Sequence, residues 1–369
     1  MPVSYRRFRA ARPCADCSGG RPRFRGLTFE LNMFTNIKHD GGVGATMRIV
    51  IPGGSGQVGT ILARAFHHRG VHVTVLSRQP QSCPWRVVGW DGKTVGAWQR
   101  EIDGADVVVN LAGRSVNCRY TATRRHEILQ SRVASTRAVG EAIACARRPP
   151  AVWLQASTAT IYAHRYDQPN DESSGRLGGA ESAAPSSWRF SIDVARAWEQ
   201  AFDEAVTPAT RKVALRSAMT LSPDAGGVFD TLVGLVRRGL GGSAGNGRQF
   251  MSWIHYEDFV AAVWWLIDRH DMAGIVNLAS PNPLPNSEFM RVLRQAYGVP
   301  FGLPARRWML EVGAAVMRTE TELILKSRRV VPGRLLEHGF AFTFANWDAA
   351  ARDLCQRWKA MRGIGRSAA

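Results

Sequence analysis

The sequence contains no apolar run long enough to cross a membrane. The best candidate, residues 260–267, is far shorter than the roughly 20 residues that a membrane helix needs, and acidic residues flank it. The 6 cysteines are scattered along the chain, which argues against a disulfide framework and favours a reducing compartment, so we expect a cytoplasmic protein. Cys14 and Cys17 have no second pair of ligands to complete a zinc site, and no metal is predicted.

Acidic residues are also few: the chain has 30 Asp and Glu and 48 Lys and Arg, which gives a formal net charge of +18. Such a charge suits nucleic acid, an anionic membrane or an anionic small molecule. Beyond residue 46 the basic residues occur mostly singly or in pairs. We therefore attribute the charge to an arginine-rich composition with an anionic cofactor or substrate, and we predict neither a nucleic-acid nor a membrane partner.

Residues 1–46 differ from the rest of the chain. They are rich in Arg, Gly and Pro, contain few acids and show no helical or strand period. Met47 directly precedes the first predicted strand. Two interpretations stay open, namely a basic targeting or disordered extension and a start codon placed too early.

The folded part begins with an apolar run that breaks into a glycine cluster. Residues 48–51 predict a buried strand, and residues 57–69 predict a helix with one apolar face. In the turn between them, Gly53 permits a tight bend, Gly56 lets the backbone approach a pyrophosphate, and Gly59 lets helix and strand pack closely. Backbone N–H groups and the positive end of the helix then face an anion. The residues predicted to bind a dinucleotide here are Gly53, Gly54, Ser55, Gly56, Gln57, Val58 and Gly59.

The second predicted strand, residues 71–76, decides between NAD and NADP. An NAD site places Asp or Glu near the end of this strand, where it binds the ribose hydroxyls. This chain has Ser77 and Arg78 there. A guanidinium pairs with a 2′-phosphate and no carboxylate repels it, so the predicted cofactor is NADP. The alternative is that Arg78 is a solvated surface residue.

Strands and helices alternate along most of the remaining chain. Further strands are predicted at 85–90, 106–111, 151–157, 213–221 and 275–278, and helices at 121–147, 188–206, 287–297, 305–326 and 347–358. This order predicts an α/β fold of the Rossmann type, a doubly wound parallel sheet. Ligands of such sheets bind at the carboxyl ends of the strands, so Leu111, Ala112 and Gly113 are predicted to line the cofactor. The polar residues 165–187 predict a loop over the site.

Four segments follow from these predictions. Residues 1–46 form the extension, 47–222 the NADP-binding Rossmann domain, 223–301 a substrate-side segment partly interwoven with its sheet, and 302–369 a small C-terminal helical domain. The C-terminal helices are typical of a packing or oligomer element, so a homodimer stays open.

Taken in order, the motifs resemble those of an extended or atypical short-chain dehydrogenase/reductase. More closely, they resemble the NAD-dependent epimerase/dehydratase superfamily, in the epimerase-like family that has a small extra C-terminal domain. The resemblance runs from Met47 to about Trp358 and includes residues 53–59, 76–78, 110–113, 131–133, 239–242, 247–249, 252–255 and 330–340, with Arg216, Asn277 and Pro283. It implies a Rossmann fold, a nucleotide cofactor that Arg216 also contacts, and a C-terminal half on the substrate side.

Reductases of this superfamily use a Tyr-x-x-x-Lys pair on a helix, in which the ammonium lowers the pKa of the phenol. This chain has Ser191 and Ala195 at the corresponding positions. Thr158 matches the residue that orients the substrate oxygen in the family. Tyr162 is the candidate proton donor, and the alternative is that its ring is structural.

Residues 223–258 are predicted to form the substrate wall. Gln249, Trp253 and His255 present polar and aromatic groups together and are the candidate substrate contacts; the alternative is that Trp253 and His255 only pack beneath the nicotinamide.

The sequence thus predicts an NADP-binding oxidoreductase or epimerase-like enzyme that acts on a small or sugar-like substrate. The missing Tyr and Lys leave a second hypothesis open, in which the chain is a nucleotide-binding regulator without catalysis.

Overall fold

The computed structural model describes residues 47–181, 184–306, 309–310 and 320–363. The expectations for residues 1–46 lie outside this part of the chain, as does much of the helix predicted at 305–326. Residues Thr46–Ala369 form one compact unit.

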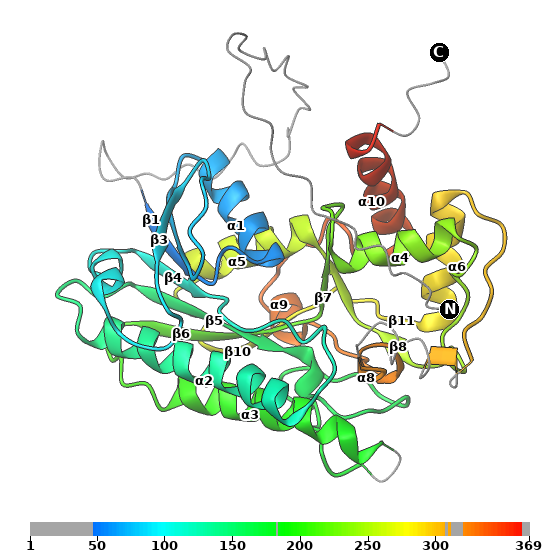
Figure 1. The fold of residues 1–369 in the computed structure, drawn as a ribbon, viewed down its shortest axis with the longest axis horizontal. Coiled ribbons are helices and arrows are strands. Elements are labelled where there is room, and N and C mark those ends of the chain that lie inside the picture. Colours follow the sequence, from blue (N-terminus) through cyan, green and yellow to red (C-terminus); the bar gives the residue numbers. More distant parts are fainter. Residues whose placement is uncertain (1–46, 182–183, 307–308, 311–319, 364–369) are drawn as a thin grey trace, which may run out of the picture. The chain divides into compact units, whose positions relative to one another are not determined.

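A parallel sheet of seven strands lies at the centre of this unit, as Figure 1 shows. Its strands are β1 (Arg48–Pro52), β2 (His72–Ser77), β3 (Arg86–Gly89), β4 (Val107–Asn110), β5 (Val152–Thr158), β6 (Arg211–Ser217) and β10 (Gly274–Leu278). They lie in the order β10-β6-β5-β4-β1-β2-β3, with all neighbours parallel. The chain runs outward from β1 in both directions, so the predicted doubly wound sheet is confirmed and its switch point lies between β1 and β4.

Helices cover both faces of the sheet. In Figure 1, α1 (Gln57–His68) and α5 (Tyr256–Asp268) lie on one face, and α2 (Ala122–Ala144) and α3 (Arg189–Asp203) lie on the other. Side chains alternate along each strand, so Ile49 and Ile51 join the core beneath α1 and α5 while Val50 joins the core of the opposite face. Burial on both faces explains why these strands read as continuous apolar runs.

The strand predicted at 213–221 is two strands, because the chain leaves the sheet after β6. Its second part, β7 (Met219–Leu221), pairs with β9 (Trp253–His255). A second core forms here against α4 (Val228–Arg237), α6 (Asn286–Tyr297) and α10 (Trp347–Met361), where the rings of Phe289 and Trp347 stack at 4.0 Å. The remaining elements are η1 (Ala97–Glu101), η2 (Ala159–Ile161), η3 (Ser186–Trp188), β8 (Phe250–Met251), β11 (Leu284–Pro285), α8 (Glu322–Leu325) and α9 (Gly333–Glu337).

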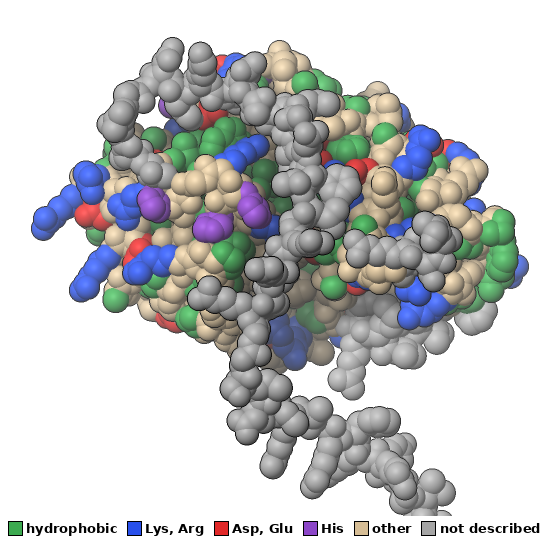
Figure 2. Space-filling model, turned by 90° about the horizontal axis from the view of Figure 1, so that it is seen from above, with side chains coloured by type: hydrophobic (Ala, Val, Ile, Leu, Met, Phe, Trp, Pro, Cys, Tyr) green, Lys and Arg blue, Asp and Glu red, His purple; other side chains and the backbone are tan. Residues whose placement is uncertain are grey.

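The charged side chains of one face can be followed in Figure 2. On the face drawn in Figure 2, Lys and Arg side chains lie in separate groups with acidic side chains among them, rather than in one continuous basic patch. Among the described residues, no helix combines the length and the apolar composition that crossing a membrane requires.

Candidate cofactor and substrate site

The turn between β1 and α1 is too crowded for side chains at two glycines. Gly53 adopts a φ of 75°, and a Cβ at this position would lie 2.5 Å from the Cα of Ala112. A Cβ on Gly59 would lie 2.4 Å from the Cα of Gly54. The turn therefore depends on the absence of a side chain at Gly53 and at Gly59, as the motif predicts.

The same turn leaves its middle open to solvent. Ser55 and Gly56 are exposed, and Gly56 is the N-cap of α1 and has no side chain with which to cap it. The first N–H groups of a helix lack partners within the helix, and the helix dipole makes them attract anions. Among the described residues, a Cβ on Gly56 would meet only the Gly53 carbonyl oxygen, at 3.7 Å. This geometry fits a pyrophosphate against the backbone.

The carboxyl end of β2 lies beside this turn. The buried Ser77 hydroxyl donates a hydrogen bond to the Ser55 hydroxyl at 3.2 Å. Arg78 follows directly and is exposed. The end of β2 thus carries a guanidinium and no carboxylate, which suits the 2′-phosphate of NADP better than the bare ribose of NAD.

A buried amide shapes the loop after β4. The Asn110 side chain accepts a hydrogen bond from the Ala112 N–H at 3.1 Å, and this bond fixes the segment 111–113 beside Gly53. From α2, the Ser131 hydroxyl accepts a hydrogen bond from the Arg114 N–H at 2.9 Å. The motif at 131–133 therefore holds the loop on which the predicted cofactor contacts lie.

The side chains of Gln57 and Val58 make contacts within the protein, and their role in binding a cofactor stays a prediction. The Gln57 side chain donates a hydrogen bond to the Ser222 hydroxyl at 3.2 Å, which ties the start of α1 to the segment after β7. Val58 packs against the core beneath α1.

Thr158 ends β5 and is half-buried, and its Oγ1 accepts a hydrogen bond from the Thr160 N–H at 3.1 Å. This position at a strand's carboxyl end agrees with contact to substrate, which stays a prediction.

Tyr162 is buried in the protein, whereas a residue that donates a proton to substrate has to be accessible to it. Its ring is buried, its hydroxyl donates to Asn277 Oδ1 at 3.0 Å, and the Arg216 guanidinium lies 5.0 Å from the ring centre. Burial raises the pKa of the Tyr162 phenol, and the Arg216 charge offsets part of that rise. These contacts favour the structural alternative for Tyr162.

Arg216, on β6, is paired with a carboxylate. Its guanidinium donates two hydrogen bonds to Glu199 on α3, at 2.7 and 2.8 Å, and the Ser157 hydroxyl donates to the same carboxylate. Burial lowers the pKa of Arg216, but the bonds and charge of Glu199 outweigh it and hold the pKa above its usual value. Contact between Arg216 and a cofactor stays a prediction.

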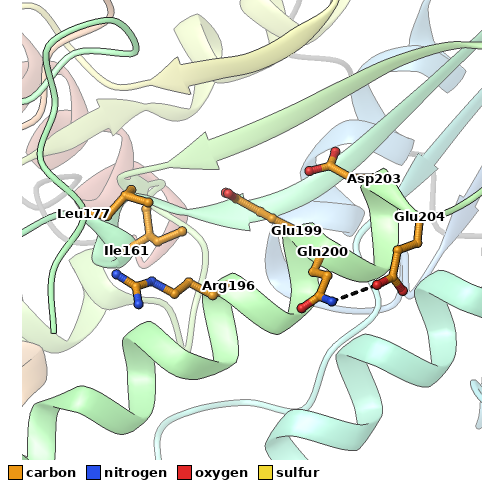
Figure 3. A pocket seen from close by; sticks show the side chains of 7 residues that line it. All are labelled: Ile161, Leu177, Arg196, Glu199, Gln200, Asp203 and Glu204. Carbon is orange, nitrogen blue, oxygen red and sulfur yellow. Dashed lines mark hydrogen bonds between the residues drawn. The ribbon is translucent and has the colours of Figure 1, made fainter.

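A hollow of about 580 Å³ lies beside α3, and Figure 3 shows the side chains that line it. Its charged groups are the carboxylates of Glu199, Asp203 and Glu204 and the guanidinium of Arg196. Because carboxylates outnumber the cation, this hollow repels a phosphate and is a poor site for a dinucleotide.

The three predicted substrate contacts are core residues, and the prediction is corrected here. The buried Gln249 side chain donates to the Ala244 carbonyl at 2.9 Å. Trp253 is 0% exposed and packs on the Trp347 ring. His255 is also 0% exposed, and its Nε2 lies 3.0 Å from Asp353 Oδ2. An apolar, aromatic strand such as β9 is buried where two layers meet, so its position in the chain did not imply contact with substrate.

Sequence reasoning missed a largely buried polar cluster between α3 and α8. It contains Ser191 on α3, Glu322 on α8, and Lys326 just after α8. The only signal in the sequence is the pair of opposite charges four residues apart at Glu322 and Lys326, within a largely apolar stretch. Among the described residues, no group of three or more His, Cys, Asp or Glu side chains is placed to bind a metal ion.

A doubly wound parallel sheet with an open glycine turn at its switch point defines a dinucleotide-binding protein of the Rossmann class. Residues 49–279 match the model of the NAD dependent epimerase/dehydratase family, and residues 307–354 match a domain of unknown function, DUF1731. The chain belongs to the NAD dependent epimerase/dehydratase family, which confirms the resemblance seen in its motifs.

Individual relatives match this chain over most of their own length. The epimerase family protein SDR39U1 of Bos taurus is 32% identical over 314 residues, which is 84% of this chain and 99% of that protein. A crystal structure of human SDR39U1 with NADPH has a TM-score of 0.73 at 28% identity, covering 84% of this chain and 99% of that one. The nucleoside-diphosphate sugar epimerase of Corynebacterium glutamicum has a TM-score of 0.66 at 25% identity, covering 86% of this chain and 62% of that one.

Proposed function

We propose that this chain binds NADPH at the β1–α1 turn and acts as an oxidoreductase or epimerase-like enzyme on a small or sugar-like substrate that carries a carbonyl or hydroxyl group. The observation that carries the proposal is the open, uncapped start of α1 at Gly56, with Arg78 as the first residue beyond β2. The human relative at 28% identity was crystallised with NADPH, which supports the choice of cofactor.

Each part of the cofactor has a counterpart in the chain. The backbone of residues 53–59 would hold the pyrophosphate, Arg78 the 2′-phosphate, and the loop 111–113 the part of the cofactor nearest β4. Bound NADPH supplies a hydride. Thr158, at the end of β5, would orient the substrate oxygen by hydrogen bonding.

The affinities for NADPH and NADH test this proposal, measured by the change in nucleotide fluorescence on binding. We expect saturable NADPH binding, about 100-fold weaker in Arg78→Ala because a charge-assisted contact with phosphate is lost, and little change in NADH affinity. Arg137→Ala is the matched control, since Arg137 is exposed on α2 and its side chain keeps 67% of its surface in solvent. Equal losses for both nucleotides in Arg78→Ala would contradict the 2′-phosphate contact.

A regulator without catalysis is the second candidate function. It is favoured by Ser191 and the buried Ala195 at the positions of the usual Tyr and Lys. NADPH oxidation with 4-nitrobenzaldehyde, hexanal and a ketose separates the two functions. Tight NADPH binding with no turnover on any of them would favour the regulator.

We extend the proposal to the setting of the protein. A small molecule is the expected partner, rather than nucleic acid or membrane, and a homodimer is the expected assembly. The described cysteines Cys83, Cys118, Cys145 and Cys355 form no disulfide, which supports a reducing compartment such as the cytoplasm. Light scattering of the purified protein tests the assembly.

A further inference from the structure

Three distant parts of the chain bring polar groups together next to Thr158. The Ser191 hydroxyl donates a hydrogen bond to Oε2 of Glu322 at 2.6 Å, and Oε1 of Glu322 lies 3.8 Å from Nζ of Lys326. The Lys326 ammonium donates to the carbonyl oxygen of Thr160 at 2.7 Å. Thr160 in turn donates its N–H to Thr158, so the ammonium lies on the backbone just beyond the predicted substrate contact.

Burying these two charged groups lowers the stability of the fold. The side chains of Lys326 and Glu322 are 1% and 3% exposed, and among the described residues Oε1 of Glu322 has no hydrogen-bond partner. A buried, imperfectly satisfied ion pair stabilises a protein less than apolar residues of the same size. Packing alone therefore does not explain these two residues, and ionisable groups with strongly shifted pKa values concentrate at functional sites.

The surroundings of Lys326 favour loss of its proton at a lower pH than for an exposed lysine. Burial, and after it the charge of the Arg328 guanidinium, lower the pKa of Lys326 to about 8, although Glu322 and Glu181 act in the opposite direction. Burial also raises the pKa of Glu322. Tyr120 and Glu320 also interact with Glu322. His164 is a further titratable neighbour, and both its own burial and the charge of Lys326 lower its pKa.

Two cavities give small molecules a place beside this cluster. One, of about 270 Å³, is lined by Lys326, Trp188 and residues 179–181 of the loop predicted to cover the site. The other, of about 480 Å³, shares Trp188 and is lined by Tyr120. The Tyr120 phenol is a hydrogen-bond partner of Ser191, so a phenol from another segment lies where α3 lacks its tyrosine.

We propose that Lys326 is an acid–base residue that exchanges a proton with the oxygen of a small carbonyl or hydroxyl compound bound in these cavities, and that Glu322 and Ser191 position it. The proposal rests on the proposed function, whose hydride donor places negative charge on the carbonyl oxygen. As that charge forms, an N–H bond of the ammonium breaks and an O–H bond forms; water then returns a proton to the amine. Glu322 and Lys326 lie within residues 307–354, so the domain of unknown function would complete the site.

Reductive alkylation tests access and protonation without requiring turnover. Acetaldehyde with sodium cyanoborohydride modifies unprotonated amines, and the five lysines Lys38, Lys93, Lys212, Lys326 and Lys359 are separable by peptide mass spectrometry. On the full-length chain with NADPH, we expect Lys326 to be modified at least tenfold faster than exposed Lys93 at pH 7.5, with a midpoint near pH 8. Protection of Lys326 in the folded protein, or a midpoint at the ordinary lysine value of about 10.4, would overturn the proposal.

Glu322→Gln separates positioning from packing. It keeps the acceptor for Ser191 and removes the negative charge, so the midpoint of Lys326 modification should move to lower pH. An unmoved midpoint would remove Glu322 from the proposal.

Turnover of 4-nitrobenzaldehyde provides the second readout. Lys326→Met should lower kcat about 100-fold and leave the NADPH affinity unchanged, since general acid–base residues contribute on this scale. Lys359→Met is the matched control, because Lys359 lies on α10 and donates to the Tyr297 carbonyl. Full turnover in Lys326→Met would refute the role of Lys326, whereas absent NADPH binding in the wild type would refute the proposed function instead.

Discussion

The proposed nucleotide side and the proposed substrate side of this molecule are built in opposite ways. The nucleotide side is one contiguous turn, residues 53–59, that leaves the start of α1 uncapped and depends on the absence of side chains. The proposed substrate side joins Ser191 of α3 with Glu322 of α8, and Lys326 just after α8 with the Thr160 carbonyl of η2. A site made of contiguous backbone can be recognised from the spacing of residues in the sequence. A site made of distant side chains exists only once the chain has folded.

The two sides also differ in what they cost the fold. Glycines at a turn cost only conformational entropy, and they leave the backbone polar groups accessible to water. The substrate side buries Arg216 with Glu199 and Lys326 with Glu322, and each charge gives up its hydration. Substitutions that isolate one of these charges should therefore have the largest effects.

The largest effect is expected on the substrate side, from Glu199→Gln. This change leaves the buried Arg216 guanidinium without its counter-charge and should lower the free energy of unfolding by about 3–5 kcal/mol, as measured by urea denaturation. Glu204→Gln, at a carboxylate whose side chain is 53% exposed and whose partner Arg137 is 3.8 Å away, should change it by less than about 0.5 kcal/mol. A loss of less than about 1 kcal/mol in the free energy of unfolding for Glu199→Gln would contradict the expected energetic difference between the two sides.

Gly53→Ala tests the nucleotide side by adding one methyl group. The new Cβ would meet the backbone of Ala112 and would have to adopt a positive φ, so we expect a loss of about 3 kcal/mol of stability together with most of the NADPH affinity. Gly70→Ala is the matched control, since Gly70 has a φ of 77° and nothing within 4 Å of the added Cβ. Equal losses in the two variants, by urea denaturation, would show that φ rather than crowding sets the cost.

The pH dependence of stability sharpens the comparison further. The pKa of Lys326 is about 8 in the folded chain, against 10.5 for a lysine side chain free in water. Below pH 8 both states are protonated, so the penalty for the buried charge is fully present. Between pH 8 and 10.5 the unfolded state binds more protons, and stability should rise by up to about 3 kcal/mol.

The control for this pH effect is Lys326→Met, which removes the titrating group. The difference between the unfolding free energies of wild type and variant should change between pH 8 and 10, with the wild type gaining relative to the variant. Parallel curves for the two proteins would mean that the ammonium is not desolvated.

The smallest effect is expected from Tyr162→Phe. It removes one hydrogen bond to Asn277 and should lower the free energy of unfolding by about 1 kcal/mol, with turnover unchanged. Tyr166→Phe, at a ring that is 40% exposed, should cost nothing measurable. A large fall in kcat for Tyr162→Phe would return this phenol to the mechanism.

Much of the fold could be predicted from the sequence because the patterns that specify its elements are local. The apolar runs at β1, β2, β4 and β5 and the glycines at 53, 56 and 59 each specify their element within a few residues. Of the candidate site, only the part that the backbone forms could be predicted from the sequence. Trp253 and His255 are polar-tipped aromatic residues next to a glycine-rich segment, and nothing local indicates that β9 lies inside a second core.

By itself, the sequence determined the doubly wound sheet, the glycine turn and the position of Arg78, since strand period, turn geometry and charge act over short stretches of chain. Only the tertiary structure decided that Arg216 pairs with Glu199 and that Lys326 lies against Thr160. The reason is physical: the pKa and the role of a charged group depend on the water it loses and the partners it meets. For these residues, both come from segments far away in the chain.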